Sequence, residues 1–277
     1  MNSLALLTGV SIPTLGLGTW RLGESRAGRA AEVASVRSAI EMGYRLIDSA
    51  EMYGEGGAEE VVGQAIAEAL RAGDVRREEL FVVSKVYPHN ASRKGTLAAC
   101  ERSQRRLGLD RIDLYLLHWR GEHALADTVA AMHTLVDDGK VAHWGVSNFD
   151  VDDMQELFAL PALQGRVEPQ RACATNQVYF SLSQRGPEFS LLPWLRAHGV
   201  PLMAYSPIDQ GTLARHAALA TIGKQRGLSA AQVALAWVAM QPGVVAIPKA
   251  VKTAHLRDNL AAADVTLGAN VPWSIGL

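Results

Sequence analysis

Four residues whose side chains can exchange or orient a proton stand at or just after the ends of short apolar runs. They are Asp48, Tyr53, Lys85 and His118. A phenol with a pKa near 10 is a weak acid at neutral pH, but a neighbouring ammonium favours the phenolate and lowers that pKa. We expect Lys85 to supply this charge, Asp48 to hold Lys85, and His118 to orient a substrate oxygen. Such a set suits reduction of a carbonyl, with the hydride supplied by a cofactor.

Each of these residues also has a simpler structural explanation. Asp48 alone would cap a turn, and Lys85 alone would be a solvated charge at a strand end. His118 alone would be a hydrogen-bonded core histidine, and Tyr53 alone a packing residue. Their appearance in order, at the same end of successive apolar runs, favours the catalytic interpretation.

Eight short apolar runs that could position these residues recur at intervals of roughly thirty residues, with helical patterns between them. They are mostly continuous rather than alternating, which is typical of strands covered on both faces. We therefore predict one (β/α)8 barrel domain over residues 1–277, in which the C-terminal strand ends meet at one mouth. No G-x-G-x-x-G follows the first run, which disfavours an open dinucleotide-binding fold. The runs are 15–18, 44–48, 81–85, 113–118, 143–147, 174–178, 202–205 and 244–249.

Local signals mark the boundaries of the other elements. Residues 4–13 predict a β-hairpin around Thr8-Gly9 that closes the bottom of the barrel. Ser229 followed by Gln232 predicts a capping box at the start of a helix. Pro187 fits the first turn of a helix that would run to Gly199. Residues 268–277 carry no helical period and predict a short, irregular C-terminal tail.

Composition limits the partners. The chain has 277 residues, a net charge of -1, 48% hydrophobic residues and 20% charged residues, which suits a barrel of about 250 residues. This charge gives no indication of nucleic acid or of an anionic membrane as a partner. The apolar stretches are shorter than the roughly 20 residues of a membrane span. We expect neither partner, and we expect a monomer.

The cysteines and the N-terminus bear on location and metal binding. Cys100 and Cys173 are the two cysteines, and the sequence contains no CxxC or HExxH motif, so we expect no metal site. Two thiols fit a reducing cytoplasm. No basic region precedes a hydrophobic run at the N-terminus, so we expect no signal peptide and a cytoplasmic protein.

The segments around the four proton-handling residues resemble the aldo-keto reductase superfamily. GYRLIDSAEMYG, SKVYPHN and DLYLLHW carry the likeness, and GLGTW, GVSNF, NQV, AYSP and IPKA continue it from about Leu15 to Val265. In that family the four matching positions form a catalytic tetrad. The resemblance implies that Tyr53 is the general acid, that Lys85 and Asp48 tune it, and that His118 orients the carbonyl.

The resemblance also implies a site for NADPH. Ser147, Asn148 and Gln177 match residues that hold the nicotinamide carboxamide, and Tyr205 matches the ring that stacks on the nicotinamide. The other cofactor positions carried over are Gly18, Thr19, Trp20 and Asp48 near the reactive end, Ser206, Pro207, Ile208 and Gly211 beside the pyrophosphate, and Lys249, Ala250, His255 and Asn259 at the adenosine end.

Two departures from the family pattern affect this site. His255 stands where the family often has an arginine that grips the 2′-phosphate of NADPH, and Ala250 replaces a frequent serine. Lys249, Lys252 and Arg257 remain as phosphate partners, so we favour NADPH and leave NADH open. Family members usually continue past residues 265–267 with a segment that closes over the substrate, whereas here ten residues follow. This predicts an open substrate pocket or an altered tail.

The motifs SAEMYGEGGAEEVVG, SKVYP and LLHWRG most resemble bacterial members that reduce small aldehydes such as methylglyoxal. We expect aromatic rings to wall a small carbonyl site, formed by Trp20, Tyr53, Tyr87, His118 and Trp119. One alternative is an NADP(H)-binding, redox-sensing auxiliary subunit, like the potassium-channel proteins of this superfamily. Another is a Schiff-base aldolase that uses Lys85, which a charged partner such as Asp48 disfavours by keeping the amine protonated.

Overall fold

The computed structural model describes residues 2–165 and 167–268. One sheet contains eight parallel strands, and it joins them in chain order. They are β3 (Leu17–Gly18), β4 (Leu46–Asp48), β5 (Phe81–Val86), β6 (Ile112–Leu117), β7 (Val141–Ser147), β8 (Cys173–Tyr179), β9 (Leu202–Tyr205) and β10 (Val244–Ile247).

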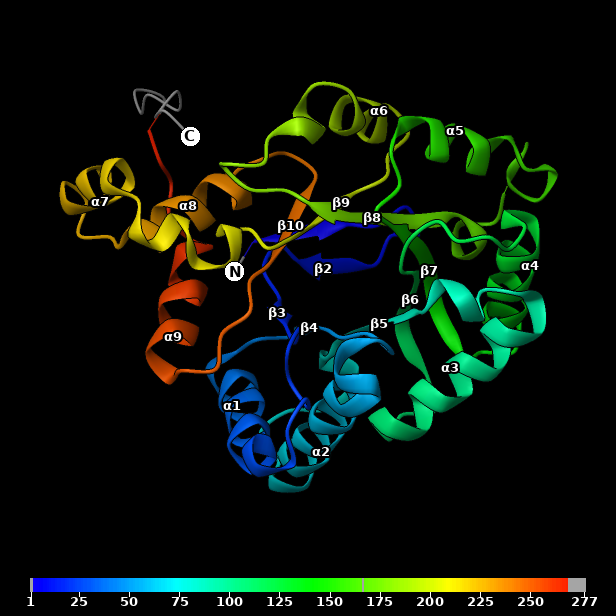
Figure 1. The fold of residues 1–277 in the computed structure, drawn as a ribbon, viewed down its shortest axis with the longest axis horizontal. Helices are drawn as coiled ribbons and strands as arrows, with labels where there is room; N and C mark the ends of the chain where they lie inside the picture. Colours follow the sequence, from blue (N-terminus) through cyan, green and yellow to red (C-terminus); the bar gives the residue numbers. More distant parts are fainter. Residues whose placement is uncertain (1, 166, 269–277) are drawn as a thin grey trace.

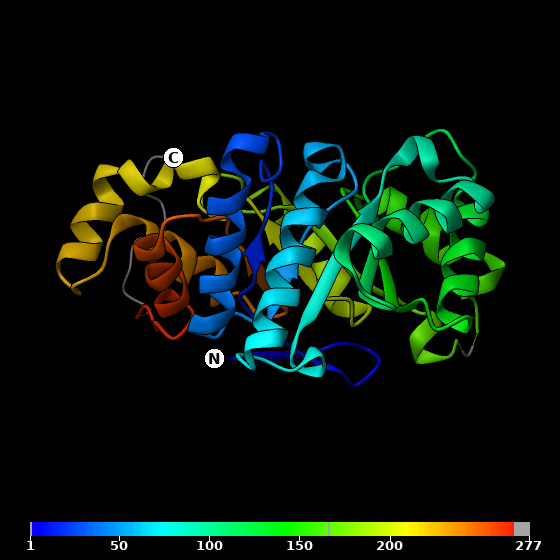
Figure 2. The same cartoon turned by 90° about the horizontal axis from the view of Figure 1, so that it is seen from below.

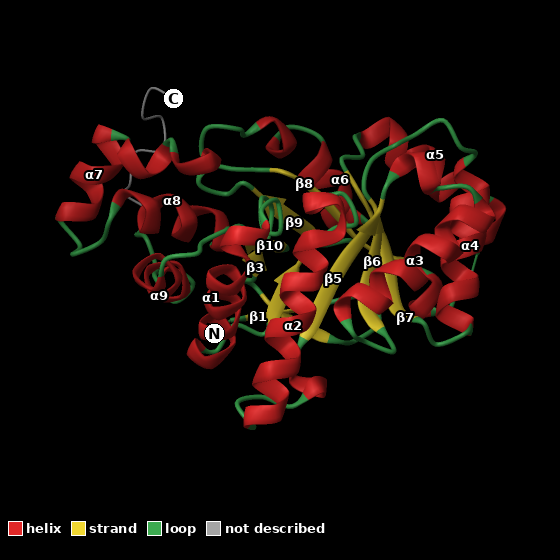
Figure 3. Ribbon diagram, turned by 60° about the horizontal axis from the view of Figure 1, so that its bottom comes forward, coloured by secondary structure: helices red, strands yellow, loops and turns green. Residues whose placement is uncertain are grey.

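Contacts between the first and last strands close the sheet into a barrel. Leu15 forms a parallel bridge with Ala246, and Gly18 forms one with Lys249. A side chain at Gly18 would place its Cβ 2.8 Å from the carbonyl oxygen of Ile247, so this close approach requires glycine. The predicted (β/α)8 barrel is confirmed, with strands in the centre and helices around them (Figures 1 and 3).

The helices pack their apolar faces against the outside of the strands, and the side chains of both form one large buried cluster. Their bounds are α1 (Arg29–Met42), α2 (Gly57–Ala72), α3 (Arg93–Leu107), α4 (Leu125–Asp137), α5 (Val151–Ala159), α6 (Leu191–Ala197), α7 (Ala217–Lys224), α8 (Ala230–Ala239) and α9 (Thr253–Ala262). None of the helices in the described ranges is long and apolar enough to cross a bilayer.

The capping box at α8 is confirmed, because Ser229 accepts a hydrogen bond from the Gln232 backbone and Gln232 accepts one from Ser229. The predicted helix from Pro187 to Gly199 is wrong in its first four residues. Pro187 lies in a separate single turn, Gly186–Glu188, and α6 begins only after Ser190. The backbone of Ser190 has φ −139° and ψ −50°, which is not helical, so the two segments cannot be continuous.

The predicted hairpin at the bottom of the barrel is confirmed. β1 (Ser3–Ala5) pairs antiparallel with β2 (Ser11–Pro13), and Leu4 lies opposite Ile12. Ile12 and Leu6 are buried among the side chains that fill the barrel interior. Figure 2 shows the hairpin, in dark blue, lying across one end of the strands. Of the predicted tail, Gly268 has no regular structure, and 269–277 lie outside the described residues.

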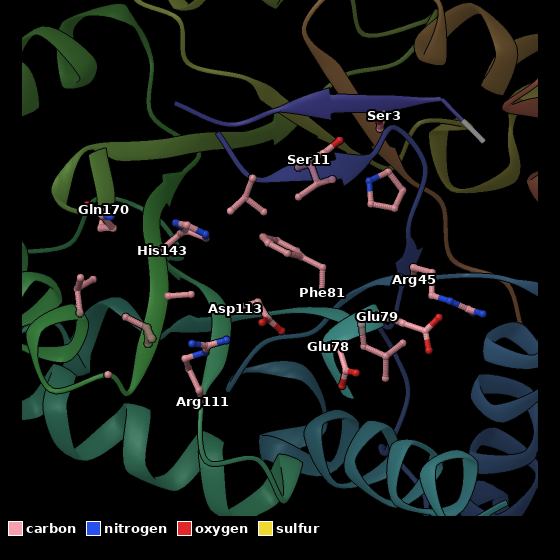
Figure 4. A pocket seen from close by; sticks show the side chains of 18 of the residues that line it. Ser3, Ser11, Arg45, Glu78, Glu79, Phe81, Arg111, Asp113, His143 and Gln170 are labelled. Carbon is pink, nitrogen blue, oxygen red and sulfur yellow. The ribbon is translucent and has the colours of Figure 1, made fainter. Parts of the chain in front are cut away.

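A hollow of about 730 Å³ lies between the hairpin and the lower ends of the strands (Figure 4). Phe81 and His143, whose rings stack 6.3 Å apart, and Asp113 all line it. These residues stand at the beginnings of β5, β7 and β6, whereas the four proton-handling residues stand at strand ends. The hollow and the tetrad therefore occupy opposite ends of the barrel.

Candidate active site

Strand alternation directs the predicted catalytic side chains into the barrel. Successive residues of a strand face opposite sides. On β5, Phe81 and Val83 belong to the interior cluster, so Lys85, two residues further, also faces inward. On β6, Leu114 and Leu116 are interior, and His118 follows in the same phase.

The same alternation places the Asp48 side chain on the inner face of β4. Leu46 belongs to the interior cluster, and Asp48 stands two residues later. Because these strands are parallel neighbours, their C-terminal ends deliver Asp48, Lys85 and His118 to one level of the barrel. The structure thus brings together residues that are up to 70 positions apart in the chain.

Lys85 is the centre of this group. Its Nζ atom lies 2.9 Å from each carboxylate oxygen of Asp48, 2.7 Å from the carbonyl oxygen of Ser49 and 3.5 Å from the hydroxyl of Tyr53. Lys85 is fully buried and Asp48 is 2% exposed. Burial lowers the pKa of Lys85, while the charge of Asp48 and its hydrogen bonds oppose that shift.

Tyr53 lies over this ion pair on a sharp turn. Lys85 Nζ is 4.9 Å from the centre of the Tyr53 ring, and the ring meets His118 edge to face at 5.7 Å. The residues that follow take left-handed backbone angles, with φ 57° at Gly54 and 52° at Glu55. A Cβ at Gly54 would come within 2.8 Å of the backbone of the loop after β3. Close packing of two loops therefore fixes where the phenol points.

The expectation that Lys85 lowers the pKa of Tyr53 is wrong for this arrangement. Burial raises the pKa of the Tyr53 hydroxyl well above its ordinary value, and the negative charge of Asp48 adds to the shift. The main physical reason is the burial of the hydroxyl, and the Asp48 carboxylate also offsets the charge of the ammonium that was expected to act on the phenol. Tyr53 consequently keeps its proton at neutral pH, which is the state that a proton donor needs.

His118 is held in its neutral form. Burial lowers the pKa of His118 to about 2, and the charge of Lys85 contributes in the same direction. Its Nδ1 atom has no hydrogen-bond partner among residues 2–165 and 167–268. A neutral imidazole has one N–H donor, so His118 can donate a hydrogen bond to a substrate oxygen without adding a charge.

The predicted nicotinamide-binding residues form a connected group beside the tetrad. Gln177 donates from Nε2 to Asp48 Oδ1 at 2.7 Å, and Ser147 donates from its hydroxyl to the carbonyl oxygen of Gln177 at 2.8 Å. Asn148 donates to the carbonyl oxygen of His118 at 3.0 Å and accepts from the Tyr205 hydroxyl at 2.9 Å. Asn148 directly follows β7 and has a left-handed backbone conformation, with φ 59°.

An irregularity in strand pairing brings Gln177 into this group. Trp144 pairs with Cys173 and Val146 pairs with Asn176, so two steps along β7 match three steps along β8. The extra residue reverses the alternation. Ala174 is interior near the start of β8, and Gln177, three positions later, also reaches the interior ion pair.

Two tyrosine rings stand at the ends of neighbouring strands. Tyr205 at the end of β9 is half-buried, and its ring centre lies 5.3 Å from that of Tyr179 on β8. The Tyr179 hydroxyl donates to Asp209, in the predicted pyrophosphate loop. The sequence analysis missed Tyr179 and Asp209; the position of Tyr179 two residues after Gln177, at the same strand end, was the available signal.

The rest of the predicted cofactor site lies at the mouth. In the loop after β9, Ser206 has φ 50° and Gly211 has φ 93°, and Pro207 is buried while Ile208 is partly buried. Thr19 donates from both its backbone and its hydroxyl to the carbonyl oxygen of Asp48, at 3.0 and 2.9 Å, which places the loop after β3 beside the tetrad.

The predicted adenosine end brings basic residues to the beginning of α9. Lys249 lies beside Gly18 through the bridge that closes the barrel, and it is exposed. His255 is exposed, whereas Ala250 and Asn259 are buried. The helix begins at Thr253 without a side-chain cap, so its first N–H groups are open to an anion.

Aromatic side chains lie next to His118. The Trp119 ring lies 4.8 Å from the imidazole and 5.3 Å from the Tyr87 ring. The structure thus brings Tyr87, His118 and Trp119 together as predicted. Trp20 is 37% exposed, and its ring stacks under the guanidinium of Arg21 at 4.6 Å.

These features define a barrel oxidoreductase in which a tyrosine, a lysine–aspartate ion pair and a histidine are grouped at the mouth. Residues 14–271 match the Aldo/keto reductase family, and the chain belongs to that family. In the described ranges, no three His, Cys, Asp or Glu residues are grouped so that they could hold a metal ion.

Named relatives align with most of this chain. The methylglyoxal reductase YeaE of Escherichia coli (strain K12) is 48% identical over 265 residues, which cover 94% of this chain and 88% of that protein. The glyoxal reductase of Bacillus subtilis (strain 168) is 38% identical over 260 residues, with 93% and 86% covered. The crystal structure of an aldo/keto reductase from Klebsiella pneumoniae in complex with NADP and acetate superposes with a TM-score of 0.87 at 45% identity, covering 96% of this chain and 91% of that one.

Proposed function

We propose that this protein reduces the carbonyl group of small aldehydes to an alcohol, using NADPH. The observation that carries the proposal is the contact of a partly buried, protonated Tyr53 with the Lys85–Asp48 ion pair, beside neutral His118. Family membership and the named activities of the methylglyoxal and glyoxal reductases agree with this chemistry.

The chain's own residues supply the proton and the orientation. When bound, NADPH supplies the hydride. Tyr53 gives its proton to the carbonyl oxygen as negative charge develops there. His118 donates a hydrogen bond to the same oxygen, which aligns the carbonyl and stabilises the developing charge. The Lys85 ammonium lies 3.5 Å from the phenol oxygen, and the part of its charge that Asp48 does not offset favours the phenolate that remains. A positioned general acid contributes about 10²–10⁴ in rate.

The connected amides and hydroxyls fit a nicotinamide carboxamide. The amide has both a donor and an acceptor side, and Ser147, Asn148 and Gln177 offer both kinds of group. Tyr205, with Tyr179 behind it, offers a flat ring for one face of the nicotinamide. Gly18, Thr19 and Trp20, on the loop beside Asp48, lie near the reactive end.

The remaining cofactor residues fit the phosphates. We assign the pyrophosphate to the loop from Ser206 through Pro207 and Ile208 to Gly211. We assign the 2′-phosphate to Lys249 and the open start of α9, with Ala250, His255 and Asn259 beside it. His255 stands where the family often has an arginine fork, but Lys249 still offers a point charge to the 2′-phosphate, so NADPH is the preferred cofactor and NADH a weaker one.

The substrate class follows from the aromatic rings near the reacting oxygen. Tyr87 and Trp119, with Tyr53, His118 and the exposed Trp20, offer mostly apolar surface and few polar groups. This set favours small aldehydes such as methylglyoxal, or aromatic aldehydes, over charged sugars.

One barrel domain carries the complete site. Two buried, free cysteines, Cys100 and Cys173, favour a reducing cytoplasm, and we propose a monomer.

The alternatives lack such support. The redox-sensing subunit needs a partner surface, and neither the relatives nor the described residues point to one. The Schiff-base aldolase needs a free Lys85 amine. All three N–H groups of the ammonium have nearby acceptors in Asp48 and Ser49, and a neutral amine would leave the buried Asp48 carboxylate without its charge partner.

The direct test mixes the purified protein, NADPH and methylglyoxal or a nitrobenzaldehyde and follows the loss of NADPH absorbance. Turnover that needs both cofactor and aldehyde is the expected result. No loss of absorbance with a panel of aldehydes and either cofactor would refute the proposal. Borohydride trapping of an adduct on Lys85 would instead favour the aldolase, and a stable heteromeric partner with negligible turnover would favour the auxiliary subunit.

A further inference from the structure

Glu51 is a buried carboxylate between Asp48 and Tyr53 that the tetrad chemistry does not use. It is 9% exposed and is surrounded by donors. Its carboxylate accepts from the Tyr87 backbone N–H at 3.1 Å, from Asn90 Nδ2 at 3.2 Å and from Arg102 Nη2 at 2.6 Å. Burial alone would raise the pKa of Glu51, but these hydrogen bonds outweigh it and the pKa is lowered. Glu51 is therefore charged and fully engaged.

These contacts prolong the pairing of β4 with β5 beyond the ends of the strands. The Ser49 N–H donates to the carbonyl oxygen of Val83, and the Glu51 N–H donates to that of Lys85. The next backbone donor, just after β5, is the Tyr87 N–H, and the Glu51 carboxylate accepts a hydrogen bond from it. The Glu51 side chain thus supplies the acceptor that a further residue of β4 would have supplied. It holds the loop that contains Tyr53 against the segment that contains Lys85 and Tyr87.

Helix α3 holds this arrangement from outside. Arg102 binds Glu51, and Arg106, one helical turn later, binds the fully buried Glu59 at 2.6 Å. Glu59 also accepts from the Ser84 hydroxyl at 2.5 Å, and Ser84 directly precedes Lys85. Two arginines on one face of α3 therefore hold two carboxylates, and each carboxylate contacts the segment around Lys85.

We propose that Glu51 and Arg102 are positioning residues for carbonyl reduction, and this inference rests on the proposed function. They set the Tyr53 hydroxyl against Lys85 and set Tyr87 beside Trp119. Their loss should lower kcat, because the proton donor shifts, and raise KM for the aldehyde, because the aromatic wall shifts. It should leave NADPH affinity unchanged, because most of the proposed cofactor contacts come from β7 to β10 and α9, across the barrel.

A matched control exists at the other end of the barrel. Asp113 is 8% exposed and accepts from the Val82 backbone N–H at 2.8 Å and from Arg77 Nη2 at 2.7 Å. Like Glu51, it is a buried carboxylate that accepts from one backbone N–H and one arginine, although Glu51 also accepts from an asparagine. It lies at the bottom hollow (Figure 4), far from the tetrad. Asp113→Asn should cost stability without changing the kinetics.

The experiment compares wild type, Glu51→Gln, Arg102→Met and Asp113→Asn by thermal unfolding, NADPH titration and steady-state kinetics. For Glu51→Gln and Arg102→Met we expect kcat to fall about tenfold to a hundredfold, KM for the aldehyde to rise, and the Kd for NADPH to stay within about twofold. For Asp113→Asn we expect a lower Tm with wild-type kcat and KM. The double variant at positions 51 and 102 should be no worse than the more impaired single variant.

Several outcomes would overturn the inference. One is wild-type kinetics in Glu51→Gln; another is an equal loss of kcat in Asp113→Asn, which would indicate a general effect of stability. A third readout needs no turnover: a crystal structure of Glu51→Gln, or of Arg102→Met if the first variant does not fold, should show Tyr53 and Tyr87 displaced. An unmoved loop would refute the positioning role even if the wild type reduced no aldehyde, an outcome that would separately refute the proposed function.

Discussion

The Nζ atom of Lys85 lies 2.9 Å from both carboxylate oxygens of Asp48, and neither side chain has appreciable contact with solvent. Gln177 donates to the same carboxylate from across the barrel. This pair therefore joins the strand ends near the proposed proton donor to those proposed to hold the cofactor. Its geometry has consequences for stability, for proton transfer and for pH dependence.

Lys85→Met should destabilise the protein as well as inactivate it. The substitution leaves Asp48 buried without its charge partner, and breaking a buried pair in this way costs about 3–5 kcal/mol. Chemical denaturation would measure the free energy of unfolding. The control is Asp48→Asn combined with Lys85→Met, which removes both charges and should be less destabilised than Lys85→Met alone. Equal losses would show that the unpaired charge is not the cause.

Tyr53→Phe should nearly abolish aldehyde reduction and leave NADPH binding intact. The ring that packs against His118 remains, and only the hydroxyl that donates the proton is lost. We expect a fall in kcat of about 10²–10⁴, measured with saturating NADPH, and an unchanged Kd from fluorescence quenching. A parallel loss of cofactor affinity would argue against a specific role in proton donation.

His118 should make stability fall in acid. Its folded-state pKa is lowered to about 2, whereas an unfolded histidine titrates near 6.5. Between these values the unfolded state binds one proton more than the folded state, so the free energy of unfolding rises with pH in this window. The contribution is at most about 1.4 kcal/mol per pH unit.

The comparison for His118 is His118→Gln, which keeps a donor but does not titrate. The stability of wild type relative to this variant should decrease steadily as the pH falls below 6.5, as followed by denaturant unfolding at several pH values. A constant difference between the two proteins would mean that His118 is not held neutral. Above pH 6.5 the difference should not vary with pH.

Lys249→Ala should weaken NADPH binding more than NADH binding. The exposed ammonium beside Gly18 is assigned to the 2′-phosphate, which NADH lacks. We expect Kd for NADPH to rise about tenfold and Kd for NADH to change little, both by fluorescence quenching. Lys224→Ala, at the end of α7 and also exposed, is the charge-matched control. Equal effects on both cofactors would place the phosphate elsewhere.

Most of the fold could be predicted from local patterns in the sequence. Short apolar runs, the Ser229–Gln232 capping box and the hairpin around Gly9 each depend on neighbours in the chain, and each appears in the structure. Asp48, Lys85 and His118 stand at the ends of successive apolar runs, so they could also be grouped from the sequence, because a parallel barrel brings its C-terminal strand ends to one mouth. Pro187 belongs to a separate turn because the backbone at Ser190 is not helical, and the serine itself, a preferred N-cap residue before Leu191, was the available signal.

The sequence by itself determined the barrel, the family resemblance and the four residues that meet at the mouth, because strand period and chain order depend only on local residue types. The tertiary structure decided the burial and the electrostatic environment of those residues. Asp48 neutralises Lys85, and burial keeps the Tyr53 proton in place. The extra residue in β8 turns Gln177 inward, and Arg102 reaches Glu51 from a helix 51 positions away in the chain. Electrostatic potential and burial depend on distances between strands, and only the closed barrel fixes those distances.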